Sequence, residues 1–198
     1  MTIYWDYTKK WVHLSIPGNE HKALQHLKKN HPSRPQHQPY QNKIPAYGAK
    51  VQYANKEYSS RPLTKEETIF VQKVIETFLF YGRAVNVKML TAIRDISSTQ
   101  ASPTEYILKR TNNFLGYSAT HPDAILTYTA SDMVLEVHSE TSCLSEPNKR
   151  SLTGGHLFLS VDTRNTTNNG AVINIYQIIK AVMTLAVEAE LGDLFINT

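Results

Sequence analysis

Hydrophobic and polar positions change their period several times along this 198-residue chain. Ile3 to Ile16 alternates loosely around the polar turn Thr8–Lys10, which predicts a β-hairpin. Pro17 and Gly18 end the alternation, and Asn19 is placed to cap a short helix. The start of the chain is therefore expected to form a hairpin followed by a helix.

A helical period begins at Thr64. The run Thr64–Glu67 has the pattern of a capping box, and the apolar side chains after it form a wide stripe. A further helix is expected from Val85 to Ile96. Ser102 to Glu105 predicts a second capping box, with proline at the first helical position. We expect these stripes to pack as a core.

From His121 the period becomes that of strands. The expected strands are Ala124–Thr129, Met133–His138, Gly155–Val161 and Ala171–Tyr176. Ile178 to Phe195 then returns to a helix-like pattern. Several antiparallel strands followed by a helix indicate an α+β or α/β fold.

The segment from Asn30 to Pro62 has no hydrophobic period, and prolines and tyrosines recur in it. This composition favours an extended, polyproline-like tether. The organisation expected from the sequence is residues 1–30, 31–63, 64–120 and 121–198.

Composition narrows the class of protein. Cys143 is the only cysteine, so no internal disulfide can form and a reducing compartment fits best. No run approaches the ~20 apolar residues of a membrane span, and Met1–Asp6 lacks the features of a signal peptide. We therefore expect an intracellular protein, cytoplasmic or nuclear, with no membrane partner.

Charge is distributed unevenly. Residues 1–63 have ten Lys and Arg against three Asp and Glu, whereas the remainder has eleven against fourteen. A basic segment interleaved with aromatic residues suits contact with a phosphate backbone, although ordinary solvated lysines would give the same count. The candidate nucleic-acid-binding residues are Lys9, Lys10, Lys22, Lys28, Lys29 and Arg34.

Several segments together resemble copia-type LTR retrotransposon polyproteins, in the C-terminal part of reverse transcriptase and the N-terminal half of ribonuclease H. The segments that carry the resemblance are Tyr4–Tyr7, Val12–Pro17, Thr120–Tyr128, His138–Ser142, Gly154–Ser160 and Glu188–Glu190. The resemblance implies a palm-like hairpin and helix in residues 1–30 and thumb-like or connection-like helices in 64–120. Residues 121–198 would then be a truncated ribonuclease H-like mixed sheet with its first helix.

In that family four carboxylates hold two Mg²⁺ ions, which promote cleavage of the RNA strand of an RNA–DNA hybrid. The resemblance places Glu140 and Glu188 at the first two ligand positions. Glu140 stands where the family has aspartate, so its carboxylate is displaced by roughly one carbon–carbon bond, and an error of about 1 Å costs ~100-fold in rate. Leu185 stands where a capping hydroxyl is expected, with Thr184 as an imperfect substitute.

The remaining two carboxylates would lie beyond Thr198, and the sequence has no paired aspartates of a polymerase. The leading hypothesis is a truncated fragment of a reverse transcriptase/ribonuclease H polyprotein that is catalytically incompetent alone and does not bind Mg²⁺ tightly. Its expected partner is an RNA–DNA hybrid or template-primer, and no small-molecule substrate is expected.

Two alternatives stay open. The chain could be a non-catalytic nucleic-acid-binding remnant that uses its basic first third, in which case binding should weaken steeply with salt. It could also have no selected function and no stable monomer, because an unpaired sheet edge beside a hydrophobic strand favours aggregation. A broad, non-cooperative melt would favour this last alternative.

Overall fold

Contacts within the chain group its residues into two units. The computed structural model describes residues 1–29, 34–40, 60–100, 102–146, 150–161, 168–181 and 183–197. Of these, the first unit contains residues 1–4, 13–29, 34–40, 60–100 and 102–126. The second unit contains residues 5–12, 127–146, 150–161, 168–181 and 183–197.

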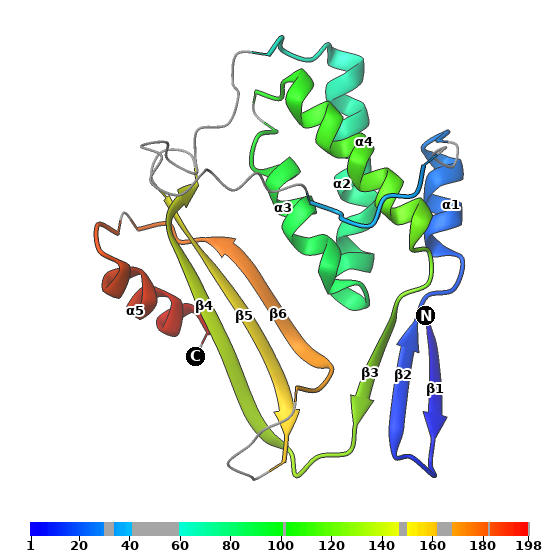
Figure 1. The fold of residues 1–198 in the computed structure, drawn as a ribbon, viewed down its shortest axis with the longest axis vertical. Coiled ribbons are helices and arrows are strands. Elements are labelled where there is room, and N and C mark those ends of the chain that lie inside the picture. Colours follow the sequence, from blue (N-terminus) through cyan, green and yellow to red (C-terminus); the bar gives the residue numbers. More distant parts are fainter. Residues whose placement is uncertain are drawn as a thin grey trace. The chain divides into compact units, whose positions relative to one another are not determined.

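The described residues form a mixed α+β architecture with five α-helices, one 3₁₀ helix and two three-stranded antiparallel sheets (Figure 1). The helices are α1 (Asn19–His26), α2 (Lys65–Ala84), η1 (Val87–Met89), α3 (Leu90–Ser97), α4 (Glu105–Thr120) and α5 (Ala186–Asn197). The strands are β1 (Thr2–Asp6), β2 (Trp11–Ser15), β3 (Ile125–Thr129), β4 (Val134–Glu146), β5 (Arg150–Ser160) and β6 (Ala171–Ile178). The sheet orders are β1–β2–β3 and β4–β5–β6.

The α+β class expected from the sequence is confirmed, but the sheet arrangement differs from the expectation in two ways. Strand β3 pairs with the N-terminal hairpin, whereas the sequence grouped it with the later strands. The expected mixed sheet is also not found in the described residues, because their strand pairs are antiparallel. No motif in the sequence specifies which edge β3 joins.

The first helix begins differently from the sequence prediction. Asn19 is the first residue of α1, and Gly18 precedes it as N-cap with φ 70° and no side-chain cap. Glycine adopts this left-handed conformation without steric cost. The predicted capping role of Asn19 is therefore wrong, since the turn after Pro17 places glycine at that position.

Helices α1 to α4 bury the apolar stripes predicted from the sequence. Phe78 of α2 and Phe114 of α4 are fully buried, and their rings meet edge to face with centroids 5.2 Å apart. Gly82 lies close to Leu90 and Ile93, which brings α2 near α3. Burial of apolar side chains is the main stabilising contribution here, at ~1.5–3 kcal/mol for each large residue.

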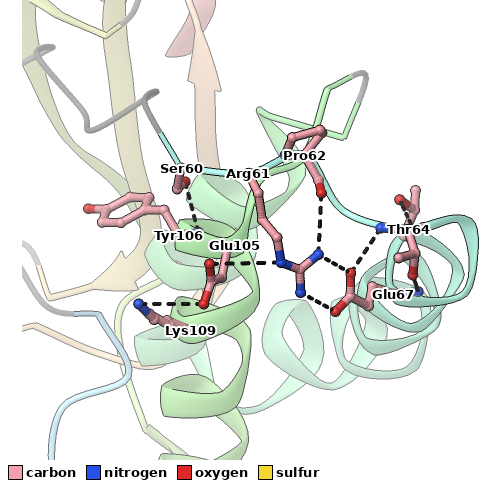
Figure 2. Close-up of polar contacts among 9 residues, drawn as sticks. Ser60, Arg61, Pro62, Thr64, Glu67, Glu105, Tyr106 and Lys109 are labelled. Atoms are coloured by element: carbon pink, nitrogen blue, oxygen red, sulfur yellow. Dashed lines mark hydrogen bonds and ion pairs between the residues drawn. The ribbon is translucent and has the colours of Figure 1, made fainter.

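The capping box at the start of α2 is present as predicted. The Thr64 hydroxyl accepts from the Glu67 amide at 3.3 Å, and the Glu67 carboxylate accepts from the Thr64 amide at 2.9 Å. Figure 2 shows Arg61 between Glu67 and Glu105. Its two terminal nitrogens donate to the Glu67 oxygens at 3.0 and 2.8 Å, and these bonds lower the pKa of Glu67 to about 2.

The predicted capping box at Ser102–Glu105 is wrong. Helix α4 begins at Glu105, and its N-cap, Thr104, makes no side-chain cap. Thr104 instead has extended backbone and bridges Pro62, while the Glu105 amide donates to the Arg61 carbonyl at 2.9 Å. This short pairing joins the segments that lead into α2 and α4, so it replaces the expected cap.

Strands β4, β5 and β6 are longer than predicted. In the β4–β5 register Glu140 lies opposite Gly154, and in the β5–β6 register Gly154 lies opposite Tyr176. Strand β6 continues to Ile178, and α5 begins only at Ala186. The predicted start of this helix at Ile178 is therefore too early. The β-branched and aromatic run at the end of β6 favours extended backbone, which explains the shift.

Most of the predicted tether at 31–63 lies outside the described residues, which resume at Ser60. Its described parts include Gln36, whose amide donates to the Thr120 hydroxyl at 2.9 Å. None of the helices in the described ranges combines the length and apolar character needed to cross a membrane.

Candidate nucleic-acid interface and the predicted metal ligands

The six predicted cationic residues are all exposed, and they divide between the two units. Lys22, Lys28 and Arg34 belong to the first unit, where they extend from α1 and the segments after it. Lys28 has φ 53° and lies just after α1, which ends at His26. Exposed cations of this kind contribute to phosphate binding through counterion release.

Lys29, another predicted cation of the first unit, contacts two helices through its ammonium group. Its Nζ donates to Asn112 Oδ1 at 3.1 Å and lies 4.8 Å from the centre of the Phe70 ring. These contacts fix the ammonium group against α2 and α4. Lys29 therefore also has a structural role, which its sequence position did not indicate.

Lys9 and Lys10 lie in the turn of the β1–β2 hairpin. The Lys9 amide donates to Asp6 Oδ1 at 2.9 Å, which closes the turn, and Lys10 adopts a positive φ of 55°. The Lys9 ammonium lies 5.0 Å from the centre of a Trp11 ring. The turn thus presents cations beside aromatic rings.

Sequence reasoning noted aromatic residues among the cations of the first third, but it named none of the rings of this hairpin as candidate binding residues. Trp5 and Tyr7 belong to the alternation that predicts the hairpin, and in the structure Trp5 is 56% and Tyr7 83% exposed. The usable signal was the aromatic and lysine alternation itself, because a two-stranded hairpin buries little on its own.

Glu140 and Glu188, the predicted metal ligands, occupy different settings. Glu140 is exposed on β4 between Ser139 and Thr141, whose hydroxyls bond toward Asp193 of α5. Because side chains alternate across a strand, Glu140 points to the opposite face of the sheet from α5. The charge of Glu140 is nevertheless near enough to α5 to contribute to the raised pKa of Asp193, after burial as the main cause.

Glu188 serves as a cap of its own helix. Its Oε2 accepts from the Thr184 amide at 2.9 Å, the Thr184 hydroxyl at 3.0 Å and the Leu185 amide at 3.3 Å. These three bonds lower the pKa of the Glu188 carboxyl. Thr184 thus donates to the acid, whereas the sequence suggested it as a hydroxyl acceptor for the helix.

The magnesium site implied by the resemblance does not fit this arrangement. Mg²⁺ needs near-octahedral oxygen ligands at short range, whereas Oε2 of Glu188 already accepts three hydrogen bonds and Glu140 lies at a position whose side chain points to the opposite sheet face from α5. Throughout the described parts of the chain, His, Cys, Asp and Glu side chains form no group of three or more that could hold a metal ion.

Helix α5 instead meets the sheet through a buried polar cluster that the sequence did not predict. Thr153 donates to Asp193 Oδ1, and Asn197 Nδ2 donates to the same oxygen at 2.8 Å and to the Thr153 hydroxyl at 3.1 Å. Burial raises the pKa of Asp193. A Cβ at Gly155 would overlap the Asn197 carboxamide, so a larger residue there would displace Asn197 from this cluster.

No family model matches this sequence, and no curated protein or solved structure is significantly similar to it.

Proposed function

We propose that this chain binds nucleic acid without copying or cutting it, and that it derives from a copia-type reverse transcriptase/ribonuclease H polyprotein. The observation that carries the binding proposal is the exposure of all six predicted cations, two of which adjoin exposed aromatic rings of the β1–β2 hairpin. Cations bind phosphates, and aromatic faces stack on bases.

The order of elements supports the proposed origin. A hairpin and helix come first, then a helical region, then β3, which pairs with the hairpin. Three antiparallel strands follow, and after them a helix that packs against β4 and β5. This is the order that the resemblance implies for palm end, thumb or connection, and ribonuclease H-like half. The finer assignment of those names to the elements is part of the proposal.

The non-catalytic part of the proposal rests on the two carboxylates. Glu188 holds the start of α5, and Glu140 faces away from that helix. Two-metal hydrolysis requires carboxylates that converge on ions roughly 3.5–4 Å apart. The expected partner is therefore bound as a ligand, and the RNA strand of a hybrid should remain intact.

Binding is tested with a fluorescently labelled single strand titrated by the full chain over a range of salt concentrations. The triple variant Lys22→Gln/Lys28→Gln/Arg34→Gln should bind more weakly and lower the salt slope by about 2, at roughly 0.7 per phosphate contact on a single strand. A matched control, Lys65→Gln/Lys73→Gln/Lys88→Gln, removes the same charge from other exposed positions.

An equal loss in both triple variants would show that only net charge matters and would overturn the localised interface. Affinity of the wild type that does not change with salt would overturn the electrostatic proposal altogether. Cleavage of an RNA–DNA hybrid in Mg²⁺ by the wild type, abolished in Glu188→Gln, would overturn the non-catalytic part.

A further inference from the structure

Residues of the hairpin, of β3 and just after it border an open hollow within the second unit. Its volume is about 310 Å³, and the rings of Trp5, Tyr7, Trp11 and Tyr128 line it together with Lys10. Figure 1 shows β1, β2 and β3 side by side, as their sheet order requires. This volume lies at the lower end of the ~300–1,000 Å³ typical of small-ligand sites, which suits one planar ring system.

Two of the aromatic residues that line this hollow have nearly parallel rings. Trp5 and Tyr7 lie two residues apart along the chain, with ring planes only 15° from parallel and centroids 6.3 Å apart. Tyr128 approaches from β3, where its hydroxyl donates to the Ala171 carbonyl at 2.9 Å, so this ring is fixed in place. Large, oriented aromatic faces are the feature that recognises an unstacked base.

Positive charge adjoins the same hollow. Lys10 lines it, and Lys9 lies over the Trp11 ring. Asp6 also lines the hollow, but its Oδ1 accepts from the Lys9 amide and so takes part in the turn. An occupant with a planar apolar part and a negative part attached to it would match both features, and a nucleotide has this composition.

We infer that the hollow holds an unpaired nucleobase of a single-stranded nucleic acid, stacked on Trp5 and Tyr7, with its phosphates beside Lys9 and Lys10. This inference rests on the proposed function and specifies which form of nucleic acid is preferred. Bases of an intact duplex are stacked on each other, so their faces are closed to such a site. Single strands offer those faces to any aromatic platform.

A bilayer surface is the competing ligand for tryptophan, tyrosine and lysine at one place. Interfacial anchors project their rings outward from a surface into the headgroup region. Here four aromatic residues line one concavity that a flat ligand can enter, although Trp5 and Tyr7 are also exposed to solvent. Vesicle binding is therefore included as an outcome of the test.

The experiment compares the full-length wild type with the double variant Trp5→Leu/Tyr7→Leu. Leucine keeps apolar character while removing both ring faces, and Trp11 stays as a fluorescent reporter. The matched control is Tyr4→Leu, because Tyr4 is an exposed ring next to Trp5 on β1 that does not line the hollow. Circular dichroism melts establish that all three proteins fold.

Four probes are titrated: a single-stranded oligothymidylate, the same length carrying abasic sites, a blunt duplex, and vesicles of phosphatidylcholine and phosphatidylserine. The double variant should lose roughly 5- to 100-fold in affinity for the oligothymidylate, as expected for removing base stacking, with its salt slope unchanged. Tyr4→Leu should bind like the wild type. The wild type should bind the abasic strand as weakly as the double variant binds the oligothymidylate.

Equal binding of the abasic and intact strands by the wild type would overturn the stacking inference even if the double variant failed to fold. Unchanged single-strand affinity in the double variant would also overturn it, while loss in the lysine and arginine variant would leave the proposed function standing. Binding to none of the nucleic-acid probes would overturn both. Vesicle binding that depends on Trp5 and Tyr7, without single-strand preference, would assign the hollow to a lipid surface.

Discussion

Helices α1 to α4 and helix α5 bury opposite kinds of side chain. The first four helices enclose apolar residues such as Phe78, Val74 and Phe114. Helix α5 buries Ala189, Asp193 and Asn197 at spacings of four along one face, while its Leu191, Leu194 and Phe195 are exposed. Helices α1 to α4 therefore bury their apolar faces, whereas α5 buries its polar face and exposes its apolar one.

The difference is explained by the surface that each helix meets. The stripes of α2 and α4 face one another, so apolar burial decides their orientation. Helix α5 meets a sheet face with Ser139, Thr141 and Thr153, and a matching polar face forms hydrogen bonds there. Each such bond contributes only ~0.5–1.5 kcal/mol net, less than a buried phenylalanine. We therefore expect the contact between α5 and its sheet to contribute less to stability than the contact between α2 and α4.

The largest expected effect is the loss of one phenylalanine ring from the helical core. Phe78 is 0% exposed, so Phe78→Ala should lower the free energy of unfolding by ~3–5 kcal/mol through lost burial and a cavity. Urea denaturation followed by circular dichroism measures this change. Peptide-resolved hydrogen exchange should show the greatest loss of protection in α2 and α4.

The matched control makes the same substitution on α5. Phe195 is 86% exposed, and Phe195→Ala should change stability by no more than ~0.5 kcal/mol. A loss from Phe195→Ala as large as that from Phe78→Ala would show that α5 buries its apolar side in solution. That result would contradict the orientation described above.

The helical part of the fold was the more predictable part. Apolar spacing from Thr64 to Thr120 identified the helices, since each stripe pairs with another stripe of the same chain. The strands were located, but the partner of β3 and the end of β6 at Ile178 were not. Strand pairing depends on contacts between distant residues, which local periodicity does not contain.

The candidate site, like the fold, was predictable from the sequence only in part. Exposure of the cations at Lys9 and Lys10 follows from their charge and turn position, and it was expected. The hollow was not expected, because Tyr128 reaches it only through the pairing of β3 with the hairpin. The capping role of Glu188 was equally hidden, since the sequence alone does not show that its carboxylate turns back to Thr184.

A second, smaller effect tests the polar contact of α5. Asp193→Ala removes the acceptor of the buried Thr153 hydroxyl and one acceptor of Asn197 Nδ2. Leaving buried polar groups unpaired costs about 1–3 kcal/mol, so the free energy of unfolding should fall by that amount. Urea denaturation and exchange of β5 and α5 peptides measure it.

Two further substitutions test whether the lost hydrogen bonds cause this fall in stability. Asp193→Asn keeps the shape of the side chain and removes a charge whose burial raises the pKa, so it should cost less than Asp193→Ala near neutral pH. Glu190→Ala on the exposed side of α5 should have almost no effect. Equal costs for Asp193→Ala and Glu190→Ala would mean that the polar cluster contributes nothing to stability.

The smallest expected effect comes from a buried acid in the first unit, which contains helices α1 to α4. Glu20 is fully buried, and in the described part of the chain neither of its carboxylate oxygens has a partner at hydrogen-bonding geometry, unlike Asp193. Burial raises the pKa of Glu20 to about 6 from 4.5, although the nearby Tyr81 hydroxyl opposes the shift. Asp123 adds a further small increase.

The sign of the pH dependence follows from this raised pKa. As pH rises from 4.5 toward 6, the unfolded state releases the Glu20 proton while the folded state retains it, so stability falls; above about 6 the loss stays constant. Glu20→Gln should therefore gain on the order of 1–2 kcal/mol relative to the wild type at about pH 7.5, and nothing at about pH 4.5. Urea midpoints across this range measure the difference, with the exposed Glu66→Gln as control. Parallel pH profiles for wild type and Glu20→Gln would show that the Glu20 carboxylate reaches water when ionised, and that the helical unit tolerates a charge as readily as the α5 contact does.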